Sequence, residues 1–199
     1  MANTRLTRAA ATPTSTLKAT MSFWIKRSAL GSAQLLIDWY TDSSNYTRIA
    51  FNDQDVLIFL SKHGDSVYGQ LTTNRKLRDT NAWYNIIVAV DTTQATDSNR
   101  MKMYINGVQE TSFSTATYPG QNTTNFKFGA AKTVGANGAA GEYFDGSMSH
   151  INYVDGSQEL PTVFGSTDAT SGIWKAKSSA SVTYGTNGFF LKMENSGAM

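Results

Sequence analysis

The sequence predicts an all-β protein built as an antiparallel β-sandwich. Strand-like segments recur at intervals of about 8 to 12 residues, which is the spacing of sandwiches and barrels. Helical periodicity is nearly absent, and 40% of the 199 residues are hydrophobic and 12% aromatic. A chain of this length and composition can bury one sizeable core, so we expect one principal domain.

The stretch from Ala82 to Phe113 is the centre of the predicted sandwich. In its first half, both faces of the predicted strand are mainly apolar. One face carries Tyr84, Ile86, Val88 and Val90, and the other carries Trp83, Ile87 and Ala89. A strand with two apolar faces is covered on both sides and lies inside a sheet.

A tight hairpin follows this strand. Asn106-Gly107 is a strong turn signal because both residue types tolerate positive φ. Ile105 should then lie opposite Val108 across the turn. Residues 92–99, which lie between the two halves, are mostly polar and predict an exposed loop.

The remaining segments can be placed in chain order. Further strands are predicted at residues 21–27, 34–40, 46–52, 55–61, 65–72, 126–130 and 142–153, around Trp174, and at 188–193. Residues 160–164 could form one helical turn with Pro161 at its first position. The glycine-rich residues 131–141 do not have the spacing of a phosphate-binding loop, and we expect a mobile surface loop there.

Composition argues against several classes of partner. The net charge is +2, from 17 basic and 15 acidic residues, and no run of like charges suggests nucleic-acid binding. Cysteine is absent, which excludes disulfides and thiolate metal sites. The N-terminus lacks the apolar core of a signal peptide, and no apolar run approaches the roughly 18 residues of a membrane helix, so we expect no membrane partner.

Three regions are expected along the chain. Residues 1–19 are rich in Thr, Ala and Arg and predict an extended N-terminal arm, either frayed or ordered against a neighbouring subunit. Residues 20–195 form the sandwich domain, and residues 196–199 form a C-terminal tail.

Several motifs, in this order along the chain, resemble those of one family. Besides Trp83-Tyr84 and the Lys-x-Tyr-x-Asn-Gly segment at 102–107, they are Ser22-Phe23-Trp24-Ile25-Lys26-Arg27, Tyr143-Phe144-Asp145-Gly146, and the segments 160–165, 172–175 and 184–191. Together they resemble the concanavalin A-like lectin/glucanase fold, a laminin-G-like jelly roll, in the form common in virion proteins of tailed bacteriophages. The resemblance covers roughly residues 20–195.

The resemblance implies possible glycanase activity, but the residues argue against an enzyme. Glycanases need two carboxylates about 5 to 5.5 Å apart, or wider for inversion. The family's usual Glu, carboxylate and Glu arrangement on one strand is missing, and so is a Gly-x-Ser-x-Gly elbow. His63 and His150 are far apart in the sequence and are expected to be structural.

No cofactor is expected; the alternative is calcium, which domains of this type often bind at strand-end loops. Asp53 and Asp55, or Asp91 and Asp97, could supply hard oxygen ligands. The alternative is ordinary turn chemistry, in which these side chains bind their own backbone.

Aromatic side chains could stack on sugar rings, although a sandwich core also uses them. We expect Trp24 and Trp83 in the core. Tyr104, beside Lys102 and opposite Gln109, is the glycan-stacking candidate.

Two functions remain open. The first is a non-enzymatic structural component of a bacteriophage virion, such as a head decoration, fibre or tail appendage protein. It would be assembled in the host cytoplasm and would contact other virion proteins through the arm, as a homo-oligomer. The alternative is a carbohydrate-binding module that recognises a host surface glycan.

Overall fold

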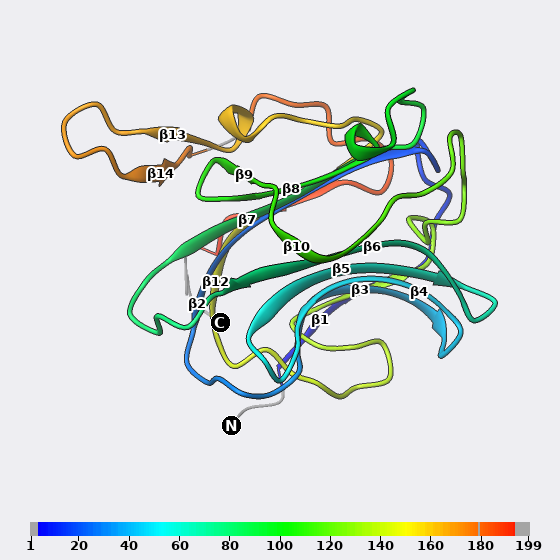
Figure 1. Ribbon diagram of the computed structural model, residues 1–199, viewed down its shortest axis with the longest axis horizontal. Helices are drawn as coiled ribbons and strands as arrows, with labels where there is room; N and C mark the ends of the chain where they lie inside the picture. The colour runs from blue at the N-terminus through cyan, green and yellow to red at the C-terminus, as the bar shows by residue number, and fades with distance from the viewer. Residues whose placement is uncertain (1–3, 179, 194–199) are drawn as a thin grey trace.

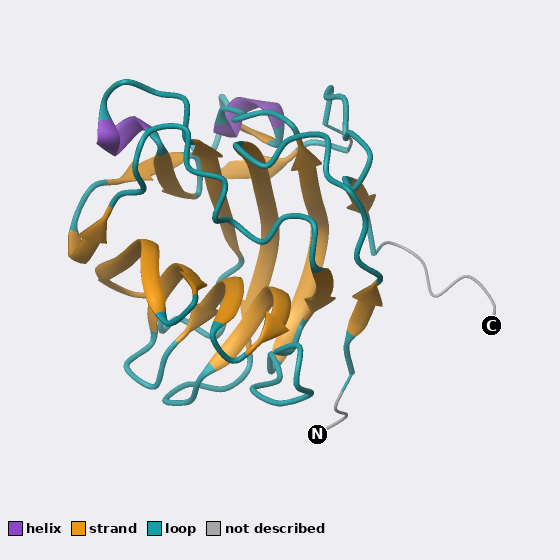
Figure 2. Cartoon of the chain, turned by 90° about the vertical axis from the view of Figure 1, so that its right-hand side faces the viewer, coloured by secondary structure: helices purple, strands orange, loops and turns teal. Residues whose placement is uncertain are grey.

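Two antiparallel sheets stack face to face in the computed structural model, which describes residues 4–178 and 180–193 (Figures 1 and 2). The strand order is β1-β11-β3-β4-β5-β6-β10 in the seven-stranded sheet and β15-β12-β2-β7-β8-β9 in the six-stranded sheet. A separate hairpin, β13-β14, extends beyond the six-stranded sheet (Figure 1). The prediction of an all-β antiparallel sandwich is confirmed.

The strands of the seven-stranded sheet are β1 (Leu6–Arg8), β3 (Gln34–Asp42), β4 (Asn45–Phe51), β5 (Val56–His63), β6 (Ser66–Lys76), β10 (Phe113–Thr117) and β11 (Ala131–Val134). Those of the six-stranded sheet are β2 (Lys18–Arg27), β7 (Tyr84–Asp91), β8 (Met101–Ile105), β9 (Val108–Glu110), β12 (Gly146–Asp155) and β15 (Phe189–Leu191). The hairpin consists of β13 (Gly165–Thr167) and β14 (Trp174–Ala176).

Strand β7 is buried along its whole length, between β2 and β8. Its residues Tyr84, Ile86, Val88 and Val90 join the core between the two sheets. Ile87 and Ala89 face the other way and pack in a second cluster with Phe164. The prediction of a strand covered on both faces is therefore confirmed.

The hairpin between β8 and β9 also forms as predicted. Asn106 has φ 51° and Gly107 has φ 78°, and Ile105 pairs with Val108. Two consecutive positive φ values are those of the type I′ turn, whose twist matches that of the strands.

The main core lies between the sheets around Trp39, whose side chain is fully buried. The ring of Trp39 makes edge contacts with Phe128 at 5.9 Å and with Tyr153 at 5.2 Å between centroids. Phe126 stacks between Phe59 and Phe128. The strand predicted at 126–130 is wrong, because these phenylalanines enter the core from an irregular segment.

The glycine-rich stretch is also more ordered than predicted. Its residues 131–134 form β11, which pairs with β3 on one side and β1 on the other. The side chains of Lys132, Thr133 and Val134 are buried. The sequence alone missed this strand because its short apolar pattern is interrupted by polar residues.

The described residues before Lys18 are extended and lie against the domain itself. Strand β1 pairs with β11, and Ala11 N–H donates to Gly129 O. The buried Asp155 carboxylate accepts hydrogen bonds from the N–H groups of Thr14 at 2.7 Å and Asn187 at 3.0 Å. Contact of this segment with another subunit stays a prediction, and the tail at 196–199 lies outside the described residues.

Helix is limited, among the described residues, to two short 3₁₀ segments, Asp97–Asn99 and Pro161–Val163. Pro161 occupies the first turn of the second, which confirms the predicted helical turn. In the described part of the chain, no helix has the length and apolar character needed to span a membrane.

A buried ionic centre joins β2 to the β4–β5 turn. The Asp55 carboxylate binds Arg27 and Arg78, each at 2.9 Å, and accepts the Gly31 N–H at 2.8 Å. Burial alone would raise the pKa of Asp55, but these hydrogen bonds and the charge of Arg27 hold that pKa below its ordinary value. The Asp55 carboxylate therefore balances the charge of the buried Arg27.

Replacing Asp55 by Ala should destabilise the fold by about 3–5 kcal/mol, because Arg27 would remain buried without a counter-charge. Denaturant unfolding at pH 7 measures this change. Since the folded pKa is depressed, the stability that Asp55 contributes should be present above its ordinary pKa and disappear as the pH falls through the folded value. Asp53→Ala, an exposed neighbour on the same turn, should change the free energy of unfolding by no more than about 0.5 kcal/mol; equal effects would contradict the assignment.

Candidate functional site

Three tryptophans from different parts of the chain gather on the outer side of the six-stranded sheet. Trp24 comes from β2, Trp83 from the segment just before β7, and Trp174 from β14. They line a hollow of about 310 Å³ together with Ser149, His150, Lys175 and Ala176. We call this surface the tryptophan face.

The prediction that Trp24 and Trp83 belong to the core is wrong. Phe23 and Ile25 of β2 are buried in the main core, so Trp24 between them points to the opposite side of the sheet and is half-buried. Trp83 precedes the first residue of β7, and 42% of its surface is exposed. Both rings sit where the covering of the outer face ends.

Trp174 is held in place by two glycines and one amide. A Cβ atom at Gly107 would lie 2.6 Å from the Trp174 ring, and one at Gly165 would lie 2.5 Å from it. The ring therefore fits between two backbone segments that only glycine leaves open. Its Nε1 donates to Asn85 Oδ1 at 2.9 Å.

The amide of Asn85 is itself fixed. Asn85 is fully buried, and its Nδ2 donates to Ser22 Oγ at 3.2 Å and to Phe23 O at 3.1 Å. Because this side chain has no freedom to rotate, the orientation of Trp174 is set before any ligand binds. A ring that is fixed in this way would lose little conformational entropy in a complex.

Polar groups border the tryptophan face on the side of β12. The pairing of β12 with β2 is irregular between Ser149 and Asn152, and His150 has φ 45°. Ser149 Oγ lies 2.8 Å from His150 Nδ1. Bulges of this kind redirect side chains and often occur beside binding sites.

Lys175 contributes a cation at the edge of the face. Its Nζ lies 2.6 Å from Asp168 Oδ2, and this contact, with hydrogen bonds from Ser171, lowers the pKa of Asp168 to about 2. The pair links β14 to the residue that directly follows β13, near Trp174. Among the described residues that line the hollow there is no carboxylate.

Tyr104, the predicted stacking residue, is buried rather than exposed. It retains 6% exposure and packs with Phe164 in the cluster on the outer face of β7 and β8. Burial also raises the pKa of its hydroxyl. The chain after residue 154 covers this part of the sheet, which the alternation around Tyr104 does not reveal.

The four calcium candidates do not converge. Asp55 binds two arginines, and Asp91 is buried with hydrogen bonds from Thr93 and Gln94 and an ion pair of 3.2 Å to Lys18. Asp53 and Asp97 are exposed. Among the described residues no three His, Asp or Glu side chains are grouped as a metal site would require. Calcium binding stays a prediction.

Two carboxylates meet one arginine on the seven-stranded sheet. Asp38 Oδ2 lies 3.3 Å from Arg48 Nη2, and Glu142 Oε2 lies 4.0 Å from Arg48 Nη1. Burial raises the pKa of Asp38, while Arg48 and the Gly138 N–H oppose that shift. Gly138 also packs on Tyr40. Asp38 and Glu142 share the charge of Arg48, and the loop with Gly138 packs over Asp38. We therefore interpret this group as a structural ion pair.

A family model described as the concanavalin A-like lectin/glucanases superfamily matches residues 3–160. The chain belongs to this superfamily. The match ends before the β13–β14 hairpin, so Trp174 lies outside the matched residues, although the segment 172–175 is among the motifs that resemble the family. A search among curated proteins gives no match.

Several solved structures share the fold at low sequence identity. A heptameric SAP-like pentraxin from Limulus polyphemus has a TM-score of 0.57 at 14% identity, over 87% of this chain and 85% of the pentraxin. A putative carbohydrate binding protein from Bacteroides ovatus gives 0.51 at 14%, over 85% of this chain and 48% of its own. The CBM40 domain of a Ruminococcus gnavus sialidase, bound to sialyllactose, gives 0.50 at 13%, over 72% and 89%.

Replacing Gly165 by Ala should displace Trp174, because the new Cβ would meet the ring at 2.5 Å. We expect a loss of about 1–3 kcal/mol in the free energy of unfolding, as for other overpacked sites, and a changed tryptophan fluorescence spectrum.

Gly172→Ala is the matched control. It has φ +69° with no atom within 4 Å of the added Cβ, so it introduces backbone strain without touching Trp174. Its emission spectrum should equal that of the wild type. An unchanged spectrum in Gly165→Ala would contradict the fixed position of Trp174.

Proposed function

We propose that this domain binds carbohydrate without cleaving it, and that the tryptophan face is its binding surface. The observation that carries the proposal is the position of Trp174, which two glycines and the buried Asn85 hold beside Trp24 and the exposed Trp83. The family membership and the likeness to carbohydrate-binding domains support it.

Stacking explains why these three rings remain partly exposed. Tryptophan has a large apolar surface, and its exposure costs free energy that burial would recover. The C–H faces of sugar rings are apolar and flat enough to pack on indole rings, while the sugar hydroxyls stay in contact with water and polar neighbours. Ser149 and His150 supply such neighbours beside the rings.

A binding role without catalysis agrees with the residues near the hollow. Hydrolysis of a glycosidic bond needs an acid and a second carboxylate at defined separation. The described residues that line the tryptophan face include Lys175 and His150 but neither Asp nor Glu. We therefore expect retention of the intact glycan.

Trp83→Ala should weaken glycan binding by about 1–2 kcal/mol, or roughly 5–30-fold, because the variant loses an exposed stacking surface. A glycan array identifies a ligand, and isothermal titration calorimetry then measures the dissociation constants of the wild type and the variant. Because Trp83 is not in the core, the variant should fold normally.

Tyr104→Phe provides the comparison. Tyr104 is buried outside the tryptophan face, so this variant should bind as the wild type does. If Tyr104→Phe abolishes binding and Trp83→Ala does not, the ligand binds elsewhere. If the array shows no ligand at all, the carbohydrate proposal fails.

A second candidate is a structural component of a bacteriophage virion, such as a head decoration, fibre or tail appendage protein. The apolar exposure near the same hairpin favours a protein contact: Val108 is 69% exposed and Ile173 is 60% exposed. Exposed apolar groups of this kind are common at protein interfaces. The phage context itself rests on the motif resemblance in the sequence.

Light scattering and a pull-down with purified phage particles distinguish the two candidates. A virion component should bind particles or oligomerise, and Ile173→Asp should prevent it without changing glycan affinity. If the protein is monomeric, does not bind phage particles and binds glycan, the result supports the carbohydrate-binding function.

A further inference from the structure

The two sheets leave an opening along one edge of the sandwich. Strand β1 ends the seven-stranded sheet and β15 ends the six-stranded sheet. Between them lies a cavity of about 320 Å³ with apolar walls from both sheets, and its lining includes Leu6, Val134, Phe189, Leu191, Arg8 and Lys132. This edge cavity is separate from the tryptophan face.

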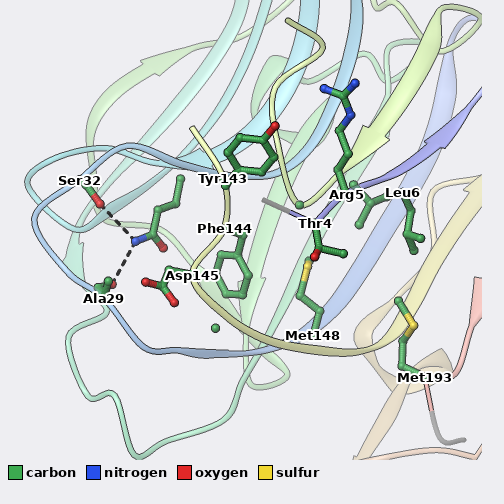
Figure 3. A pocket seen from close by; sticks show the side chains of 14 residues that line it. Thr4, Arg5, Leu6, Ala29, Ser32, Tyr143, Phe144, Asp145, Met148 and Met193 are labelled. Atoms are coloured by element: carbon green, nitrogen blue, oxygen red, sulfur yellow. Dashed lines mark hydrogen bonds between the residues drawn. The ribbon is translucent and has the colours of Figure 1, made fainter. Parts of the chain in front are cut away.

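A larger cavity of about 630 Å³ adjoins the edge cavity and shares Leu6 and Val134 with it. In Figure 3, Leu6 lies near Met193 and Met148, and Ser32 and Ala29 lie at the opposite end. Both volumes fall within the range of small-molecule sites, roughly 300–1,000 Å³. The two cavities adjoin at Leu6 and Val134, and the lining there is apolar, with Met148 and Met193 close to Leu6 (Figure 3).

The edge cavity contains a buried cation that forms no ion pair with a described carboxylate. Lys132 is 1% exposed, and its Nζ donates to Ala130 O at 3.2 Å. In the described part of the chain, no carboxylate lies within ion-pair distance of this ammonium group. A buried ammonium group is costly unless an anion approaches it.

Arg8 adds a second positive charge at the same place. Its guanidinium donates to the carbonyls of Gly188 at 3.1 Å and Thr186 at 3.2 Å, and neither acceptor is charged. Burial and the repulsion from Arg8 lower the pKa of Lys132 to about 8, although Asp155 opposes the shift. Two cations thus share an apolar cavity.

We propose that the edge cavity binds the carboxylate of an aliphatic acid, with the carboxylate beside Lys132 and Arg8 and the hydrocarbon chain along Leu6 and Val134. The carboxylate supplies the missing counter-charge, and the apolar walls cover the chain. This site does not depend on carbohydrate binding at the tryptophan face.

Decanoate is a suitable probe, and calorimetry below its micelle concentration measures its affinity. Wild-type protein should bind decanoate at least roughly tenfold more tightly than decanol, because charged hydrogen bonds to Lys132 form only with the acid. Lys132→Met keeps a long side chain with an apolar stem but removes the ammonium group. This variant should lose the preference for decanoate over decanol. Lys102→Met, on β8, should retain it.

A second measurement follows the charge of Lys132 itself. NMR titration should show its pKa rise from about 8 when decanoate binds, because an adjacent anion favours the ammonium form. The other groups that act on this titration are Arg8, Asp155 and Tyr153. Unchanged titration, equal affinity for decanol and decanoate, or no binding would overturn the proposal.

Discussion

The burial of β7 on both faces is the constraint on which the rest of the molecule depends. Its inner face belongs to the core between the sheets, as in any sandwich. Its outer face carries Ile87 and Ala89, which water would otherwise contact, so a further layer must cover them. The chain after β12 supplies that layer through Phe164 and its neighbours. The tryptophan face begins where this layer ends.

Much of the fold could be predicted from the sequence because local patterns and tertiary structure agree there. The Asn106-Gly107 turn needs two positive φ values, and both residue types tolerate them, so the turn is indicated by the local sequence alone. β11 and the segment with Phe126 and Phe128 could not be placed. Their structure depends on contacts with β3 and with Trp39 that are remote in sequence, so neither alternation nor turn residues indicate them.

The candidate site was harder to predict than the fold, because alternation tells which residues share a face but not what covers it. Trp24 and Tyr104 both point outward from the six-stranded sheet, yet the C-terminal layer covers only Tyr104. Trp174 joins the face from a hairpin about 90 residues after Asn85, its hydrogen-bond partner. The available sequence signal for the position of Trp174 was a pair of glycines, Gly107 and Gly165, which both lie against the indole ring.

Among the described residues, Arg27 and Lys132 are both buried cations, but their charges are compensated differently, and this difference is the basis for proposing an anion site in the edge cavity. Arg27 has the Asp55 carboxylate at 2.9 Å and the Leu77 carbonyl as partners, so its charge is compensated inside the protein. Lys132 is equally buried, but its ammonium group donates to the uncharged Ala130 carbonyl and lies over the Tyr153 ring, and it forms no ion pair with a described carboxylate. A methionine would fill the same space without the desolvation cost. A lysine at this position therefore reduces the stability of the unliganded fold, and an anion bound between the sheets would recover that free energy.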